Sequence, residues 1–255
     1  MTLGLTPDWH TASLQNIPVL NDQELHVWCL PLKINANQKS IALKMLSDIQ
    51  RERYHRRHIA GQSSYLAGRY YLLQLLAAYT KQDPAAVKLS YTRLNKPYLS
   101  FHEGGITFNF TDTDSAEGPI ALFAFCRDRE VGVDIEAISR KSNFRAIVKK
   151  RFTESEQAFV TDSSGNVIPE RFLAIWTRKE ASGKATGQGI NFKMNSRELL
   201  SFDKAGLACS NHNYFDEQGL PWRLSQLNLK SQHIGCVVHA SHEPLRLRAF
   251  DELLI

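Results

Sequence analysis

Alternation of apolar and polar positions marks several β-strands along this chain of 255 residues. Such alternation is typical of a strand with one buried face, and a short continuous apolar run is typical of a strand buried on both faces. The sequence therefore predicts strands at residues 25–30, 106–110, 120–126, 131–136, 222–229 and 233–239.

Helical patterns precede each group of strands. One runs from about residue 40 to residue 79, and Gly61 is expected to break it into two helices. A further helix starts at Thr153, and a long one begins at about Pro169 after a turn at residues 163–166. The order of helix pair and then sheet occurs twice, which predicts an α+β fold made of two similar halves joined near residue 130. Their shared cleft would lie between residues 131–136 and the helix from Pro169.

Two carboxylates share one face of the strand at residues 131–136. In V-G-V-D-I-E, Asp134 and Glu136 are two residues apart, so their side chains point the same way. A solvent-facing strand edge would explain this pair if it stood alone.

A second group of polar side chains follows at residues 176–189. Trp176, Glu180 and Lys184 are each four residues apart and lie along one helix face, shortly before Gly187 and Gly189. Glu followed by Lys at this spacing is usually an exposed ion pair. Together with the strand, however, the helix supplies a third carboxylate and a lysine, which suit Mg²⁺ and a substrate phosphate.

Composition narrows the possible partners. A hydrophobic content of 43% and a charged content of 22% are typical of a soluble globular protein, with neither a signal peptide nor a membrane-spanning run in the pattern. The four scattered cysteines form no C-x-x-C pair, which indicates reduced thiols in a cytoplasmic protein. The formal charge of +5 favours an anionic partner, either nucleic acid, a nucleotide or an acidic protein.

The two motifs together resemble the signature of the Sfp-type 4′-phosphopantetheinyl transferases. V-G-V-D-I-E at residues 131–136 is followed by W-x-x-K-E-A-x-x-K-x-x-G-x-G at residues 176–189, in the order that the family requires. Upstream, K-P at residues 96–97 and F-N-F-T-D-T at residues 108–113 resemble the family's K-P and F-N-x-S-H-S elements. Residues 250–254 resemble the family's C-terminal tail.

The resemblance implies an enzyme with two half-domains related by pseudo-twofold symmetry and an active site at their interface. Residues 1–130 would hold the nucleotide end of coenzyme A, and residues 131–255 would carry the metal ligands. The enzyme would be a cytoplasmic monomer that does not bind nucleic acid or membranes. It would use Mg²⁺ to transfer the 4′-phosphopantetheine arm of coenzyme A to a serine of an acidic acyl or peptidyl carrier protein, releasing 3′,5′-ADP.

The resemblance also assigns roles to individual residues. Glu180 and Lys184 would be catalytic, and the Mg²⁺ ligands would be Asp134, Glu136 and Glu180. The groups that would contact coenzyme A are Arg53, Arg69, Lys96, Pro97, Asn109, Thr111 and Lys184.

Two positions leave alternatives open. Glu156 fits a capping box with Thr153, and this is preferred over a role in proton transfer. Asp112 stands where the family usually has a histidine associated with the 3′-phosphate of coenzyme A, and an aspartate would repel that phosphate. We expect Asp112 to turn away and Arg69 with Lys96 to hold the phosphate.

Two other classes of protein would use some of the same residues. A metal-dependent nuclease would need carboxylates, a lysine and a basic surface, but it would more often carry its acid and lysine two residues apart on a strand. A non-catalytic nucleic-acid-binding module would explain the positive charge but not the grouped carboxylates, which repel phosphate in the absence of a metal.

Overall fold

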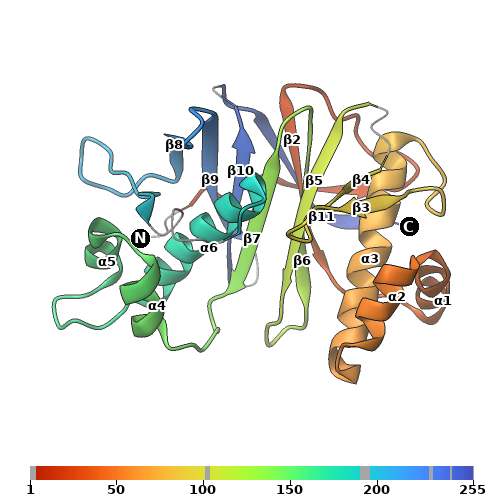
Figure 1. The fold of residues 1–255 in the computed structure, drawn as a ribbon, viewed down its shortest axis with the longest axis horizontal. Helices are drawn as coiled ribbons and strands as arrows, with labels where there is room; N and C mark the ends of the chain where they lie inside the picture. Colours follow the sequence, from red (N-terminus) through yellow and green to blue (C-terminus); the bar gives the residue numbers. More distant parts are fainter. Residues whose placement is uncertain (1–3, 101–103, 190–195, 230–231, 242, 255) are drawn as a thin grey trace.

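Two β-sheets lie side by side through the middle of the protein, and the helices gather at its two ends (Figure 1). The computed structural model describes residues 4–100, 104–189, 196–229, 232–241 and 243–254. Helices and strands are mixed along the chain, so the predicted α+β class is confirmed. Within the described residues, no helix is both long and apolar enough to cross a bilayer.

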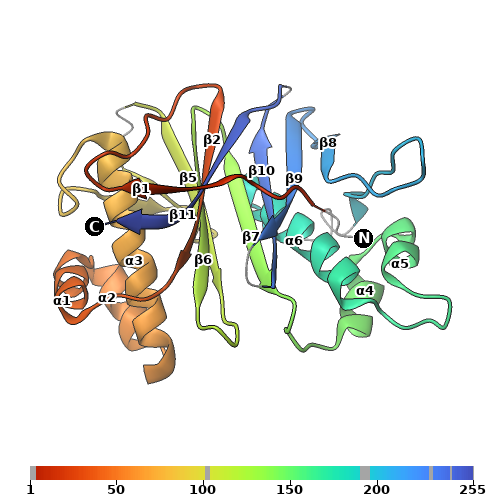
Figure 2. The same ribbon diagram turned by 180° about the vertical axis from the view of Figure 1, so that it is seen from behind.

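The first sheet contains the last strand of the chain as well as the early ones. Its strand order is β1-β11-β2-β6-β5, with bounds β1 (Trp9–Ser13), β2 (Glu24–Pro31), β5 (Ile106–Thr113), β6 (Ile120–Arg127) and β11 (Arg246–Leu254). β11 lies between β1 and β2 and is parallel to both (Figure 2). A separate two-stranded sheet joins β3 (Leu89–Tyr91) and β4 (Pro97–Leu99).

The second sheet begins at residue 131, where the sequence places the junction between the two halves. Its strand order is β7-β10-β9-β8, and every neighbouring pair is antiparallel. The bounds are β7 (Val131–Ala137), β8 (Asn211–Phe215), β9 (Pro221–Leu229) and β10 (His233–Ala240). Because β11 returns to the first sheet, the two sheets do not divide the chain at one point. The half-domains 1–130 and 131–255, and their pseudo-twofold relation, stay predictions.

Three helices, rather than the predicted two, lie beside the first sheet; the third packs against the strands, and the first two pack on the third. They are α1 (Ala36–Met45), α2 (Asp48–His55) and α3 (Ile59–Thr80). The prediction of a break at Gly61 is wrong, since Gly61 lies in the first turn of α3 at a position where a side chain would meet no other atom. The chain breaks earlier, because Ser47 forms a capping box that starts α2 and His58 precedes α3.

The helices of the second half are α4 (Phe144–Arg151), α5 (Glu154–Val160) and α6 (Pro169–Thr186). α5 begins at the predicted capping box, in which Glu156 Oε2 accepts from the Thr153 amide at 2.9 Å. α6 carries Pro169 at its first position, as predicted from the sequence. α4 lies in the basic stretch that precedes Thr153 and was not predicted.

The central strands of the first sheet are buried on both faces. Trp28 of β2 and Phe123 of β6 belong to the core that includes residues of α3, whereas Val27 and Leu122 pack against Val133 of β7 in a second core between the sheets. Burial on both faces explains the nearly continuous apolar sequences of these strands. The second core fixes β7 beside the first sheet. All four cysteines are free thiols.

Candidate active site

A glycine in β7 lets helix α6 lie directly on this strand. A Cβ atom at Gly132 would come within 2.2 Å of the Ala181 carbonyl oxygen and 2.3 Å of the Ala185 nitrogen, both in α6. No side chain larger than hydrogen fits there without displacement of the helix. The close approach brings Asp134 and Glu136, farther along β7, next to the side chains of α6.

The predicted stripe on α6 does face these carboxylates. Lys184 Nζ donates to Asp134 Oδ1 at 2.7 Å, and Trp176 Nε1 donates to Glu136 Oε1 at 3.1 Å. Lys184 Nζ also donates to Thr111 Oγ1 of β5 at 2.8 Å, so it connects the two sheets. The helix ends at Gly187, whose left-handed φ of 69° serves as the helix cap.

The charge of Asp134 influences the ionisation of the other two carboxylates. Burial raises the pKa of Glu136 to about 7, and the charge of Asp134 adds to the effect. Burial and the same charge raise the pKa of Glu180, and burial raises the pKa of Asp134 itself. Because nearby like charges disfavour ionisation, a cation among these groups would stabilise their charged forms.

The residues present fit a divalent cation with oxygen ligands. Asp134 Oδ2 is buried and accepts no hydrogen bond, so this oxygen is available to a ligand. Carboxylate oxygens are the ligands that Mg²⁺ prefers in proteins. In the described parts of the chain, however, no three acidic, histidine or cysteine side chains are already gathered as a metal site. Instead, Lys184 contacts Asp134 and Arg140 contacts Glu136.

A cavity of about 360 Å³ lies beside Lys184. Its walls come from the β3–β4 turn, from β5 and from the C-terminal end of α6; the lining residues are Leu94, Asn95, Lys96, Pro97, Asn109, Phe110, Gly183, Lys184, Gly187, Gln188 and Gly189. Four of the predicted coenzyme A contacts are in this list. The cavity is within the size range of small-molecule sites, and two lysines, Lys96 and Lys184, are among its lining residues.

Two of these lining residues also connect segments that are far apart in the chain. Lys96 Nζ donates to Glu130 Oε2 at 2.5 Å and to the Ala185 carbonyl at 2.8 Å, which ties the β3–β4 turn to the end of α6. Asn109 Oδ1 accepts from the Val133 amide at 3.0 Å and joins β5 to β7. Asn109 therefore has a structural role that its sequence context did not indicate.

Arg53 and Arg69 lie outside the lining of this cavity. Arg53 Nη2 donates to Asn95 Oδ1 at 2.8 Å, so it contacts one of the lining residues. Arg69 is buried and lies over the rings of Tyr65 and Phe110, and its Nη1 has no hydrogen-bond partner. A role for either arginine toward coenzyme A stays a prediction.

Asp112 lies among basic side chains. Desolvation raises its pKa, and the charges of Arg57, Lys184 and Arg69 oppose that shift. When ionised, Asp112 therefore partly neutralises the positive charge that would otherwise attract a phosphate group. Whether it turns away when a phosphate binds stays a prediction.

Glu156 has a structural role besides its capping bond. Its Oε2 lies 2.9 Å from Lys179 Nζ, and neither side chain is exposed. Its Oε1 accepts from the Leu199 amide at 3.0 Å, and Lys179 Nζ donates to the Arg197 carbonyl at 2.9 Å. This buried pair attaches α5 and the segment after residue 196 to α6.

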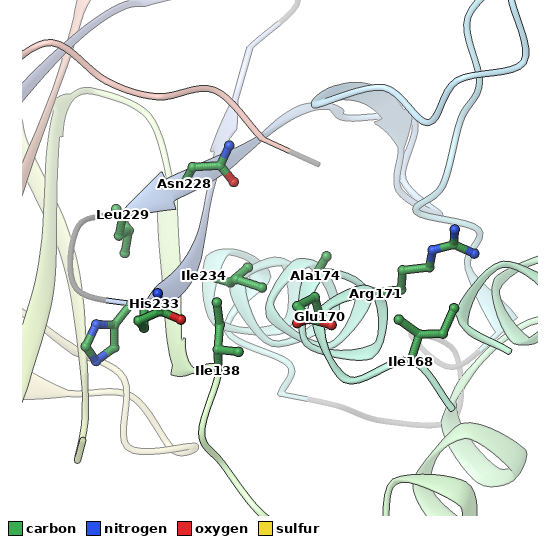
Figure 3. A pocket seen from close by; sticks show the side chains of 10 residues that line it. Ile138, Ile168, Glu170, Arg171, Ala174, Asn228, Leu229, His233 and Ile234 are labelled. Atoms are coloured by element: carbon green, nitrogen blue, oxygen red, sulfur yellow. The ribbon is translucent and has the colours of Figure 1, made fainter. Parts of the chain in front are cut away.

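A larger cavity of about 550 Å³ lies at the other end of α6 (Figure 3). Its wall is mainly apolar, with Ile138, Ile168 and Ile234 among the lining residues, and it contains none of the predicted site residues. Arg171 at its edge donates to the Phe159 carbonyl at 3.0 Å. The smaller cavity beside Lys184 is therefore the better candidate for a phosphorylated ligand.

Arg140 is a site residue that the sequence did not identify. It follows the end of β7, and its amide donates to the Ala137 carbonyl at 2.9 Å in a turn. The turn directs the guanidinium back to Glu136 and over the Trp176 ring. The sequence showed only that Arg140 begins a basic stretch, and the spacing of four residues signals a contact in a helix but not after a strand.

Comparison with known proteins agrees with this arrangement. Residues 130–238, which include β7 and all of α6, match the 4′-phosphopantetheinyl transferase superfamily. The 4′-phosphopantetheinyl transferase HetI of Nostoc sp. is 30% identical over 178 residues, covering 69% of this chain and 73% of that protein.

Two further relatives are more distant. A phosphopantetheinyl transferase of Thraustochytrium sp. is 28% identical over 175 residues, covering 64% of this chain and 59% of that protein. An L-aminoadipate-semialdehyde dehydrogenase-phosphopantetheinyl transferase of Xenopus laevis is 25% identical over 198 residues, covering 70% of this chain and 64% of that protein.

Proposed function

The chain belongs to the 4′-phosphopantetheinyl transferase superfamily, and we propose that it carries out this transfer at the site formed by β7 and α6. The enzyme moves the phosphopantetheine arm of coenzyme A to a carrier protein. The acceptor is a serine hydroxyl, and 3′,5′-ADP is the leaving group. The observation that carries the proposal is the position of the Lys184 ammonium group. It contacts Asp134 and Thr111, and Lys184 also lines the neighbouring cavity.

The acidic groups Asp134, Glu136 and Glu180 would hold one Mg²⁺ ion. When bound, the ion neutralises the charge that develops on the pyrophosphate during transfer. The unsatisfied Asp134 Oδ2 and the raised pKa values of all three groups support this assignment. Binding would exchange cation contacts within the protein for metal contacts.

Lys184 would bind the pyrophosphate of coenzyme A and stabilise the departing phosphate. Its Nζ lies at the junction of the carboxylate cluster and the cavity, within reach of both. The serine oxygen forms a bond to the pantetheine-side phosphorus, while the bond from that phosphorus to the oxygen of 3′,5′-ADP breaks. Glu180 would accept the serine proton as the general base.

Coenzyme A would place its nucleotide end in the cavity beside Lys96 and Pro97. Arg53, Arg69, Asn109 and Thr111 would support it from the first half of the chain. The net charge of +5 favours an acidic acyl or peptidyl carrier protein, because opposite charges speed encounter. A monomeric state, a cytoplasmic location and the absence of nucleic-acid binding stay predictions from the sequence.

Substitution of Glu180 tests this proposal. We expect E180Q to lower the rate of 3′,5′-ADP release by at least about 100-fold, because one charge contact in the transition state is lost. The rate is measured by chromatography with coenzyme A, Mg²⁺ and an apo carrier protein. Glu170→Gln on an exposed position of the same helix is the matched control. Equal rates for E180Q and E170Q would remove Glu180 from the site.

A further inference from the structure

Arg140 contacts the acidic cluster directly through Glu136. It forms an ion pair with Glu136, and its Cζ lies 5.7 Å from the centre of the Trp176 ring. Its charge also lowers the pKa values of Asp134, Glu136 and Glu180, an effect that it shares with Lys184 for all three groups. Arg151, by comparison, acts on Glu180.

The local backbone holds Arg140 in this position. The Ile138 amide donates to the Gln232 carbonyl at 2.9 Å, and the Arg140 amide donates to the Ala137 carbonyl at 2.9 Å, so the chain turns directly after β7. The ion pair is partly buried, with side-chain exposures of 30% for Arg140 and 13% for Glu136. The guanidinium therefore has an open side through which it can leave.

A divalent cation held by Glu136 would compete with Arg140 for this carboxylate. Glu136 Oε1 already accepts from Arg140 Nη1 and from Trp176 Nε1. An oxygen lone pair that accepts a hydrogen bond from the guanidinium is not available to a metal ion. In addition, the positive charge of the guanidinium would repel a cation bound beside it. Lys184 differs from Arg140, because it has a second partner in Thr111 and lies next to the cavity.

We propose that Arg140 is a built-in counter-ion of the acidic cluster, which leaves Glu136 when a divalent cation binds and thereby weakens metal binding. The proposal rests on the metal site of the proposed function. It describes metal entry as an exchange of one cation for another. In the protein without metal, Arg140 compensates part of the negative charge of the three carboxylates. Displacement of Arg140 costs free energy, and this cost lowers the affinity for the metal ion.

Mn²⁺ binding to R140Q tests the proposal without turnover. Free Mn²⁺ is counted by electron paramagnetic resonance with protein and coenzyme A present and carrier protein absent, and a protein-free sample corrects for binding to coenzyme A. We expect R140Q to bind Mn²⁺ about tenfold more tightly than the wild type, because one repulsive charge is removed from the ion's immediate surroundings. Lys141→Gln, an exposed neighbour with the same charge change, is expected to stay within about twofold of the wild type.

Tryptophan fluorescence gives a second measurement of the same exchange. Trp176 contacts both Glu136 and Arg140, so Mn²⁺ or Mg²⁺ is expected to change its emission in the wild type. Mn²⁺ is paramagnetic and can itself quench tryptophan fluorescence, so the measurement with Mg²⁺ serves as the control. The change should be absent in W176F and reduced in R140Q.

The outcomes separate the two proposals. Equal or weaker Mn²⁺ binding by R140Q, with normal binding by the wild type, would overturn the role of Arg140 and leave the metal site intact. Tighter binding by R140Q and K141Q alike would also overturn it, because the effect would then come from net charge. No Mn²⁺ binding by the wild type or by R140Q would refute the metal site and the role of Arg140 together. R140K keeps the charge and is expected to bind like the wild type.

Discussion

The carboxyl group of Glu136 makes the stability of the folded protein depend on pH. Burial raises its pKa from the usual 4.5 to about 7. Between these two values the folded protein binds a proton that the unfolded chain has already released, so stability falls as the pH rises through this range. Each pH unit corresponds to about 1.4 kcal/mol, which gives a total of about 3 kcal/mol. The cost is fully present above pH 7 and absent below pH 4.5.

Replacement of Glu136 by glutamine removes this cost without a change in side-chain size. We expect E136Q to be more stable relative to the wild type at pH 8 than at pH 5: the free energy of unfolding of E136Q minus that of the wild type should be about 2–3 kcal/mol larger at pH 8. Urea unfolding with EDTA present measures both proteins at both pH values. The other titrating groups are common to the two proteins, so their contributions largely cancel in this comparison.

Addition of Mg²⁺ provides the control for this prediction. An ion bound to Glu136 should stabilise the wild type at pH 8 and should stabilise E136Q much less, since binding to the folded state alone raises stability. If the stability difference between E136Q and the wild type were the same at pH 5 and pH 8, Glu136 would not be an acid with a raised pKa. The electrostatic description of the cluster would then be wrong.

Three further predictions concern packing, the buried ion pair and the phosphate contact. Gly132→Ala should destabilise the protein by about 1–3 kcal/mol and lower activity, because the added methyl group displaces α6; an unchanged melting temperature and rate would contradict the close packing. Lys179→Met should cost about 3–5 kcal/mol in urea unfolding by leaving the Glu156 charge uncompensated, and adding Glu156→Gln, which removes the charge and keeps an acceptor oxygen, should recover part of it; no recovery would refute the pairing. Dephospho-coenzyme A should show a higher KM than coenzyme A, whereas equal values would show that no effective 3′-phosphate site exists near Asp112.

Local signals in the sequence were sufficient for the elements that carry the site. Alternation at residues 131–136 predicted β7, and the four-residue spacing of Trp176, Glu180 and Lys184 predicted the face of α6 that meets it. The capping box of Thr153 correctly gave the start of α5. These predictions succeeded because each depends on neighbours within one turn or one strand.

Contacts between segments that are distant in the chain could not be predicted from the sequence. The Glu156–Lys179 pair joins two helices, and the Asn109–Val133 bond joins two sheets, so neither follows from local spacing. Arg140 reaches Glu136 only because the chain turns after β7. The break was misplaced because Gly61 is accommodated in the first turn of α3, at a cost of about 1 kcal/mol relative to alanine, whereas α2 starts at the Ser47 cap and α3 follows His58.

The order of the strands in the first sheet also could not be predicted from the sequence. β11 follows the second sheet in the chain but lies between β1 and β2 of the first sheet. Its apolar positions indicate only that one face is buried, and they do not specify which sheet it joins. Prediction of this return needs the tertiary packing of both halves.

Intact mass spectrometry of an apo carrier protein tests the central claim most directly. The carrier is incubated with this protein, coenzyme A and Mg²⁺, and its mass is compared with that of a variant carrier whose acceptor serine is alanine. We predict a mass increase equal to one phosphopantetheine on the serine form and none on the alanine form or with EDTA. No increase on any of several acyl and peptidyl carriers, with active coenzyme A and Mg²⁺ present, would contradict the assigned activity.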